Sequence, residues 1–328
     1  MTPPSPLLYL NATDLDALGL STGGIVDVLE AVFRHKAAGD TRMPPKIFFH
    51  FGEDRFYSAM ASSCPPLGYA GCKWQAGDPA NPARGLPYIQ GLYILNDHAS
   101  GEMLAIMDAK WITGRRTAAA SALVARYQAP PGAATLAILG CGVQGRAHLE
   151  ALSGEVPSLR LCRAYDVVPQ RQADYVAEMD ARHGAVRVRG AAGAREACED
   201  ADIIVTGGPI RHHRTPTLEP GWIKPGALVV TIDYDSYVTD ACIAAMDLVI
   251  TDDREQIADA RRNEGKFPGV TRIDADLSEL IAAGNGRRTG GGQRVMAFNL
   301  GIALEDVATA AHCLRLARER GVGTALAP

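Results

Sequence analysis

A glycine-rich motif constrains the fold of this 328-residue chain more than any other feature of its sequence. The motif, Gly-x-Gly-x-x-Gly over residues 140–145, directly follows the apolar segment Thr135–Leu139 and precedes a helix predicted to begin near Val143. The first glycine permits a tight turn, the second lets the backbone approach a phosphate, and the third lets helix and strand pack closely. The free amides at the helix N-terminus attract an anion. This order of elements predicts a dinucleotide-binding Rossmann unit.

The motif and its surroundings supply the predicted cofactor-binding residues. The next predicted strand ends at Asp166, at about the spacing where a carboxylate accepts hydrogen bonds from the ribose hydroxyls of adenosine. A carboxylate at this position repels the additional phosphate of NADP, so it favours NAD as the cofactor. Arg163 and Arg171 lie nearby in the sequence, and they keep NADP open as an alternative. The predicted contacts within the motif come from Gly140, Gly142, Val143, Gln144 and Gly145.

Two further residues are assigned to the cofactor. Thr206 ends the third predicted strand of the same segment. Asn299 precedes Gly301, and its side chain is a candidate for binding the carboxamide of nicotinamide. The alternative interpretation is that Asn299 is only a turn residue.

The pattern of apolar residues divides the chain into two kinds of sheet. Runs that are apolar throughout are typical of parallel strands covered on both faces. Such runs, with helical segments between several of them, occupy 135–139, 159–166, 201–206, 227–232 and 247–251. The preceding part instead carries β-rich runs without intervening helices, which predicts an antiparallel or mixed sheet. These runs are Lys46–Phe51, Phe56–Ser63, Gly68–Trp74, Gly91–Asp97 and Met103–Asp108.

The length of the chain suggests two domains. A predicted helix over Trp111–Tyr127 ends before a Pro-Pro-Gly sequence within residues 128–132, which is typical of a domain boundary. Gly284–Gly292 is predicted to be a loop, and Gly301–Arg320 reads as a closing amphipathic helix.

Composition and charge exclude several classes of partner. Apolar residues make up 47% of the chain and charged residues 21%, which is typical of a folded protein. The net charge of −4 gives no reason to expect a nucleic acid or an anionic membrane surface as a partner. The longest apolar runs are strand-length, and the N-terminal residues lack the features of a secretory signal. Seven cysteines without a Cys-x-x-Cys pair favour reduced thiols, so we predict a cytoplasmic protein without a metal site.

Three cations before the glycine motif are candidates for substrate binding. Arg42 lies at a strand entrance, Lys73 lies near the end of a strand, and Arg116 lies in the helix that follows the strands. Cations at the ends of elements can converge on a carboxylate, to which arginine offers a bidentate fork and lysine a movable point charge. The alternative interpretation is that each of them is a solvated surface residue.

Short motifs along nearly the whole chain carry a family resemblance. They are Lys73-Trp74, Asn81-Pro82, Gly85–Pro87, Leu95–Asp97 with Gly101, Asp108, Arg116–Ser121, Gly140–Gly145, Asp252–Gln256 and Gly301–Asp306. In this order they resemble the ornithine cyclodeaminase/μ-crystallin family. The resemblance implies an α/β fold in which a Rossmann domain of residues 129–300 is inserted into a mixed α+β domain for substrate binding and dimerisation. Residues 1–128 would form the first part of that domain, and residues 301–328 would form a C-terminal helix that returns to it.

The resemblance also implies roles for individual residues. Arg42, Lys73 and Arg116 would hold the carboxylate of a small amino or imino acid substrate, and Lys73 would also lie near the reacting nitrogen. Arg116 and Thr117 would line the cofactor together with the glycine motif and Asp166. The expected protein is a homodimeric, NAD(P)-dependent oxidoreductase that acts on the α-carbon of its substrate, as amino acid dehydrogenases and imine reductases do.

The segment after the fourth parallel strand separates members of this family. Cyclodeaminases carry an Asp-Cys-Pro-Gly-Lys-like stretch there, whereas this chain reads Ile232–Val238 without Pro-Gly-Lys. Tyr88 replaces the threonine that cyclodeaminases tend to have, and residues 264–267 and 299–301 look more like N-carboxyalkyl amino acid dehydrogenases. These features favour a dehydrogenase or imine reductase. A cyclodeaminase-type lyase with bound NAD and a non-catalytic, μ-crystallin-like binding protein stay open.

Proton transfer at the substrate nitrogen requires an acid or base. Asp235 aligns best with the family aspartate, so Lys73 and Asp235 are the predicted catalytic residues, and Asp233 is the alternative to Asp235. The competing candidates are the histidines His50, His98, His148, His212, His213 and His312. For the pair at 212 and 213, a solvated loop is the alternative interpretation.

Overall fold

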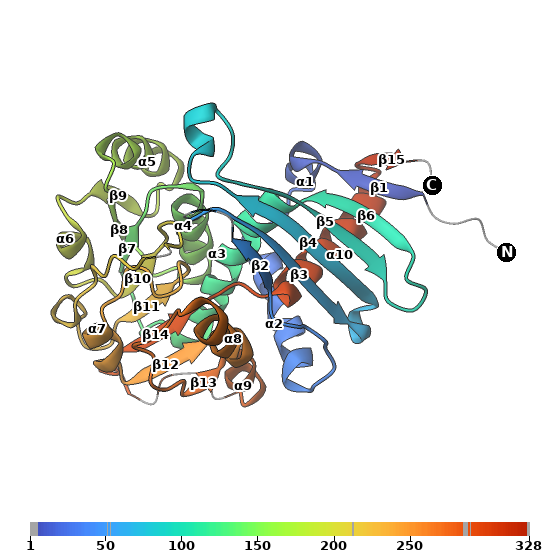
Figure 1. Cartoon of the computed structure of the whole chain (residues 1–328). Coiled ribbons are helices and arrows are strands. Elements are labelled where there is room, and N and C mark those ends of the chain that lie inside the picture. The colour runs from blue at the N-terminus through green and yellow to red at the C-terminus, as the bar shows by residue number, and fades with distance from the viewer. Residues whose placement is uncertain are drawn as a thin grey trace. The chain divides into compact units, whose positions relative to one another are not determined.

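The computed structural model describes residues 6–50, 52, 54–211, 213–284, 288 and 290–326. His212 and parts of the loop predicted at 284–292 lie outside the described residues. The chain divides into two compact units, Met1–Arg116 with Ile302–Pro328 and Thr117–Gly301. Each unit contains one β-sheet, and Figure 1 shows both. The first unit is thus built from the two ends of the chain, and the second unit is continuous in sequence.

The first unit contains a seven-stranded mixed sheet in the order β15-β1-β6-β5-β4-β3-β2. Neighbouring strands are antiparallel except for β1 and β6, which pair in parallel. The mixed sheet predicted from the β-rich runs is therefore confirmed. The strands are β1 (Leu7–Leu10), β2 (Ile47–His50), β3 (Phe56–Cys64), β4 (Tyr69–Gly77), β5 (Ile89–Asp97), β6 (Met103–Asp108) and β15 (Thr324–Leu326).

Helix α10 (Ala303–Arg320) covers one face of this sheet, where it packs on β3, β4 and β5 and on α2 (Thr22–Ala37) (Figure 1). The predicted closing helix is confirmed, although it begins after Ile302 rather than at Gly301. Its first turn carries Glu305 and Asp306, which suit the positive end of the helix dipole. The unit also contains α1 (Ala12–Ala17), η1 (Pro65–Leu67), η2 (Asn81–Arg84) and the first turns of α3 (Ala109–Gln128).

The second unit contains an eight-stranded sheet in the order β13-β12-β14-β11-β10-β7-β8-β9, and all its pairs are parallel. Its strands are β7 (Thr135–Leu139), β8 (Leu161–Tyr165), β9 (Arg187–Gly190), β10 (Ile203–Thr206), β11 (Leu228–Thr231), β12 (Leu248–Thr251), β13 (Ala275–Asp276) and β14 (Val295–Phe298). The order around β7 is that of a Rossmann sheet, so the predicted fold is confirmed. The short elements α4 (Val143–Glu155), α5 (Pro169–Arg182), α6 (Ala194–Cys198), η3 (Pro220–Trp222), α7 (Asp240–Ala244), α8 (Arg254–Glu264) and α9 (Leu277–Ala282) complete the unit.

The two units meet in sequence inside helix α3, between Arg116 and Thr117. The Pro-Pro-Gly sequence predicts this boundary after residue 128. The difference has a physical reason in the first turns of α3. The indole of Trp111 donates a hydrogen bond to Asp16, and Arg116 forms ion pairs with residues of α10, so these turns belong to the first unit.

The seven cysteines are free thiols, and six of them are buried. Among the described residues, no helix is long and apolar enough to cross a membrane. In the same part of the chain, no group of three or more histidine, cysteine, aspartate or glutamate side chains is arranged to hold a metal ion.

Candidate functional site

The glycine motif of the second unit connects β7 to α4, and each of its glycines has a separate steric reason. Gly140 adopts φ +111°, and a Cβ added there would lie 2.6 Å from the carbonyl oxygen of Gly207. A Cβ on Gly145 would lie 2.4 Å from the carbonyl oxygen of Gly140. A Cβ on Gly142, the N-cap of α4, would meet no atom within 4 Å. The loop is therefore tight on its inner side and open above the helix N-terminus, where Val143 is exposed, as a pyrophosphate site requires.

Asp166 lies directly after β8 and beside this loop. Its Oδ2 accepts a hydrogen bond from the backbone N–H of Cys141 at 2.8 Å, and its Oδ1 accepts one from Val168 at 2.9 Å. These bonds hold the carboxylate next to the motif, where adenosine ribose is expected. Nη1 of Arg163 donates to the carbonyls of Glu196 and Glu199 at the end of α6.

Asp233 follows β11 and is fully buried at the carboxyl end of the sheet. Its Oδ1 accepts a hydrogen bond from Thr206 Oγ1 at 2.8 Å, and its Oδ2 accepts one from the N–H of Gly208 at 3.0 Å. Burial raises the pKa of this carboxyl from 3.8 to about 7, although both hydrogen bonds act in the opposite direction. Asp233 can therefore exchange a proton near neutral pH, and Thr206 contacts it directly.

Asp235 has different surroundings although it lies two residues further on. Its Oδ2 accepts a hydrogen bond from the N–H of Phe267 at 2.8 Å and forms an ion pair with Arg214 at 3.2 Å. Between the two aspartates, Tyr234 is buried with φ +61°, a conformation that a tyrosine rarely adopts. The contacts of Asp235 hold this strained turn against the segment that carries Phe267.

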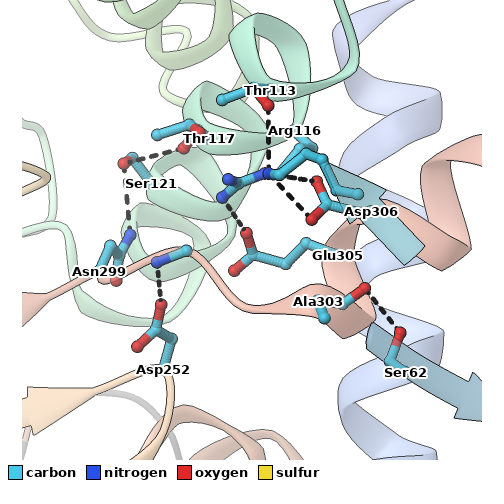
Figure 2. Close-up of polar contacts among 12 residues, drawn as sticks. Ser62, Thr113, Arg116, Thr117, Ser121, Asp252, Asn299, Ala303, Glu305 and Asp306 are labelled. Carbon is cyan, nitrogen blue, oxygen red and sulfur yellow. Dashed lines mark hydrogen bonds and ion pairs between the residues drawn. The ribbon is translucent and has the colours of Figure 1, made fainter. Parts of the chain in front are cut away.

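A buried polar network joins α3, α4 and the residue after β14. His148 Nδ1 lies 2.8 Å from the carbonyl oxygen of Gln144, and its Nε2 lies 2.8 Å from Ser121 Oγ. The amide nitrogen of Asn299 lies 3.3 Å from the same Ser121 oxygen, as Figure 2 shows. Desolvation lowers the pKa of His148 from 6.5 to about 4, so this imidazole is neutral at physiological pH. The sequence interpretation of His148 as a possible acid or base does not fit this environment.

The first unit buries a cluster of paired charges between β4, α3 and α10. Lys73 is fully buried, and its ammonium lies 3.0 and 3.1 Å from the two carboxylate oxygens of Asp306 and 3.2 Å from Thr113 Oγ1. Desolvation lowers the pKa of Lys73 from 10.5 to about 8, and the attraction of Asp306 opposes this shift. A lysine in this state can lose or accept a proton at mildly alkaline pH.

Arg116 shares the same carboxylate with Lys73. Its Nε donates to Asp306 at 3.0 Å and its Nη1 donates to Glu305 at 2.7 Å, as seen in Figure 2. Two cations and two carboxylates therefore lie together, so their formal charges cancel. The structure thus brings two of the three predicted substrate-binding cations to one point.

The third predicted cation, Arg42, is exposed and is not joined to this cluster by any contact among the described residues. Its guanidinium donates to the carbonyls of Gly39 and Thr41 at 3.1 and 2.8 Å, so it stabilises its own loop. Lys46 lies close enough to Lys73 to lower its pKa, and sequence reasoning did not single it out.

Sequence reasoning also missed the roles of Glu305 and Asp306, which it used only as part of a motif. The sequence does carry a signal for these roles. The buried side of this helix is almost wholly apolar, yet its first turn carries two acidic residues. Buried carboxylates need partners, so each of them predicts a buried cation elsewhere in the chain.

The second unit has a Rossmann-type parallel sheet with a complete glycine-rich turn, and the first unit has buried paired cations. Together they define a two-domain α/β protein of the dinucleotide-binding class. The chain belongs to the ornithine cyclodeaminase/mu-crystallin family, whose model matches residues 10–320. The resemblance inferred from the motifs is thereby confirmed.

Curated relatives and solved structures match nearly the whole chain. A nodulation efficiency protein of Rhizobium meliloti is 30% identical over 98% of this chain and 98% of its own. Alanine dehydrogenase of Archaeoglobus fulgidus is 30% identical over 97% of both chains. Δ1-pyrroline-2-carboxylate reductase of Thermococcus litoralis, solved with NADH and L-proline, is 26% identical with a TM-score of 0.88 over 98% of this chain and 100% of that chain. An archaeal alanine dehydrogenase dimer with bound NAD is 29% identical with a TM-score of 0.87 over 98% of this chain and 99% of that chain.

Proposed function

We propose that this protein is an NAD(P)-dependent oxidoreductase that acts on the α-carbon of a small amino or imino acid. The observation that carries the proposal is the fully buried Lys73 ammonium, which shares Asp306 with the guanidinium of Arg116. Structural stability alone is a weak reason to bury two cations, because their desolvation costs about as much as their pairing returns. Two donors of different geometry beside one another suit a ligand with a carboxylate and a nitrogen. The reductase and alanine dehydrogenase relatives act on such compounds.

The second unit supplies residues that fit a nicotinamide dinucleotide. Gly140, Gly142 and Gly145 leave room for a pyrophosphate at the N-terminus of α4, and Asp166 suits the adenosine ribose. The buried Oδ1 of Asn299 has no hydrogen-bond partner among the described residues, and it suits the carboxamide. The bound cofactor supplies or accepts the hydride, whereas the chain orients it and the substrate. We infer NAD rather than NADP because Asp166 opposes a 2′-phosphate.

For the proton on the substrate nitrogen we propose Asp233 rather than Asp235. Oδ2 of Asp235 contacts Arg214 and the N–H of Phe267 and so stabilises the turn around Tyr234, whereas its Oδ1 has no hydrogen-bond partner among the described residues. Asp233 lies at the carboxyl end of β11 with a pKa raised to about 7 by burial. A group with a pKa near the working pH is suited to both donating and accepting a proton. Ligands of parallel sheets also bind at the carboxyl ends of the strands.

We also propose that the protein is a homodimer. Trp74 follows Lys73 on β4, so it points to the sheet face opposite the charge cluster. Its ring stacks on Tyr57 with centroids 5.5 Å apart. An exposed apolar face of this kind on a sheet is typical of a subunit interface. The side chains on this face, each between 37% and 56% exposed, are Ile47, Phe49, Tyr57, Trp74, Leu92 and Ile94.

Light scattering at micromolar concentration tests the dimer. We expect the wild type to give twice the chain mass and Trp74→Glu to give a monomer, because a carboxylate would be buried at the interface. Val167→Glu, at an exposed side chain of the other unit, should remain a dimer. A monomeric wild type would contradict the proposal.

The free cysteines support a cytoplasmic location, which stays a prediction.

Incubation of the purified protein with NADH tests the activity. The substrates are a panel of 2-oxo acids with ammonia or with amino acids, and cyclic imines such as Δ1-pyrroline-2-carboxylate. Net loss of NADH absorbance supports the oxidoreductase. Ammonia release from ornithine without net absorbance change would instead indicate a cyclodeaminase-type lyase. Dinucleotide binding without turnover of any substrate would indicate a binding protein.

A further inference from the structure

Ser121 and His148 form a polar network with Asn299 but have no role in the function proposed above. We propose that Ser121 and His148 are positioning residues that orient the amide of Asn299, so that the protein selects dinucleotides whose nicotinamide carries an unmodified carboxamide. This inference rests on the proposed function, because it assumes that the second unit binds a nicotinamide dinucleotide. It concerns the choice among such cofactors and not the substrate.

The direction of the network begins at Gln144. Its backbone carbonyl can only accept a hydrogen bond, so the His148 Nδ1 that lies 2.8 Å away must carry a hydrogen. Desolvation keeps this fully buried imidazole neutral, with a pKa lowered to about 4. A neutral imidazole has one N–H, so Nε2 is an acceptor.

The next group, Ser121, has one hydrogen to donate. Its oxygen lies 2.8 Å from His148 Nε2 and 3.2 Å from the carbonyl oxygen of Thr117. The shorter contact involves an acceptor that has no other donor in the network, so the hydroxyl hydrogen points to His148. The Ser121 oxygen can then only accept a hydrogen bond from Asn299.

This result determines how the Asn299 amide is turned. Its NH₂ group faces Ser121 at 3.3 Å, and its Oδ1 faces the opposite side (Figure 2). The backbone around Asn299 is fixed on both sides, because its N–H donates to Thr231 at 2.9 Å and the N–H of Gly301 donates to Asp252 at 2.7 Å. The side chain is also buried, so we expect its main freedom to be the turn of its amide, which the contact with Ser121 sets.

The oxygen that remains has the character of a ligand-binding group. Asn299 is 3% exposed, and its Oδ1 has no hydrogen-bond donor among the described residues. Buried acceptors without a donor are uncommon in folded proteins. With adenosine at Asp166 beyond β8, the nicotinamide end extends past β7 toward the carboxyl ends of β10, β11 and β14. Asn299 follows β14, so the NH₂ of a carboxamide is the donor that its oxygen is placed to meet.

Three ligands separate this interaction from general dinucleotide binding. NAD⁺ carries the carboxamide, its 3-acetylpyridine analogue replaces the NH₂ by a methyl group, and ADP-ribose lacks the ring. We expect wild-type protein, titrated by fluorescence, to bind NAD⁺ about 3–10-fold more tightly than the analogue, the difference expected for one net hydrogen bond.

Ser121→Ala should reduce this ratio of affinities to near one, because the Asn299 amide is then free to turn. Its affinity for ADP-ribose should stay within about twofold of the wild type. Ser153→Ala is the matched control, because the Ser153 hydroxyl donates to the carbonyl of Glu150 in the same helix and has no contact with the network among the described residues.

Nitrogen-15 NMR of histidine-labelled protein gives a readout independent of binding. The resonances of His148 should show a protonated Nδ1 and an unprotonated Nε2 at neutral pH, and a protonated Nε2 would overturn the inference. Equal affinity of the wild type for NAD⁺ and the analogue would also overturn it. If Ser121→Ala lowered the affinity for all three ligands equally, the network would have only a structural role. Failure of the wild type to bind ADP-ribose and NAD⁺ at all would instead overturn the proposed function.

Discussion

The two units differ in the partners of their most deeply buried ionisable groups. In the first unit, Asp306 and Glu305 compensate Lys73 and Arg116 within 3.1 Å. Desolvation still lowers the pKa of Lys73 to about 8, but the attraction of Asp306 opposes the shift. In the second unit, His148 and Asp233 have no ion-pair partner among the described residues, and burial moves the pKa of each toward its neutral form.

This contrast predicts which kind of change destabilises each unit. Paired charges are sensitive to the loss of one partner, because the other is then buried without compensation. Groups kept neutral by burial are sensitive to pH, because ionisation must occur at the expense of stability. The predictions below test this division.

The largest expected effect is that of Lys73→Ala. We expect turnover to fall by roughly 10²–10³, because a preorganised donor is lost. The free energy of unfolding should fall by about 3–5 kcal/mol, because Asp306 loses a buried partner. NADH affinity should stay near normal, since the glycine motif, Asp166 and Asn299 belong to the other unit. Steady-state kinetics, denaturant titration and NADH fluorescence measure the three quantities.

Matched variants separate the two consequences of losing Lys73. Lys73→Ala with Asp306→Asn removes one charge of each sign and should recover stability without recovering turnover. Lys73→Arg should also lose turnover, because a planar fork cannot occupy the place of a compact ammonium. Lys110→Ala, at an exposed lysine of α3, should change neither. Near-normal turnover of Lys73→Ala would remove the substrate site from this cluster, and loss of NADH binding would break the division between the units.

A second, smaller effect concerns pH and Asp233. The pKa of this carboxyl rises from 3.8 in the unfolded chain to about 7 in the folded protein. Its contribution to stability is therefore fully present below about pH 4 and is lost as pH rises to about 7, by up to about 4 kcal/mol. Asp233→Asn cannot ionise, so the variant should gain stability relative to the wild type as pH increases through this window. Denaturant titrations at pH 4 to 8 measure the difference.

The control for this prediction is Asp235→Asn, which removes a carboxylate that is paired with Arg214. It should lose stability across the same pH range rather than gain it. An amide at 233 facing the N–H of Gly208 adds a penalty, but that penalty does not change with pH. Parallel stability curves for Asp233→Asn and the wild type would contradict the assignment of Asp233.

The smallest expected effect is the choice between NADH and NADPH. We expect the wild type to bind NADH about tenfold more tightly, which corresponds to about 1.4 kcal/mol, because Asp166 opposes a 2′-phosphate. Asp166→Ser should reduce the preference, whereas Asp174→Ser, at an exposed carboxylate of α5, should preserve it. Equal affinities of the wild type in a fluorescence titration would show that Arg171 has overcome the effect of Asp166.

Much of the fold could be predicted because its signals are local. The strand Thr135–Leu139, the glycines after it and the helix from Val143 occur together in the sequence, and the structure has them at these residues. Strand β14 was missed although it lies between β11 and β12. It has only four residues, Val295–Phe298, and the glycine-rich sequence before it suggested a loop rather than the approach to a central strand.

The candidate site was harder to predict because its residues depend on distant partners. Lys73 and Arg116 could be identified as candidates because they are cations near the ends of predicted elements. Their partners could not, because Asp306 lies 233 residues after Lys73 and Glu305 lies 189 residues after Arg116. Asp233 and Asp235 are separated by one residue, so no pattern could show which of them contacts a permanent cation. The φ of +61° at Tyr234, which sets the two carboxylates in different surroundings, has no signature in a tyrosine.

The separation of Lys73 from Asp306 has a consequence during protein synthesis. The ribosome adds about 5–20 residues per second, so the 233 residues between them take on the order of ten to fifty seconds to make. The second unit, Thr117–Gly301, is completed within this interval and has all the strands of its own sheet. The first unit must wait for α10 and β15, which follow the second unit in the sequence. Until α10 is made, the ammonium of Lys73 lacks its counter-ion Asp306 and must remain solvated by water.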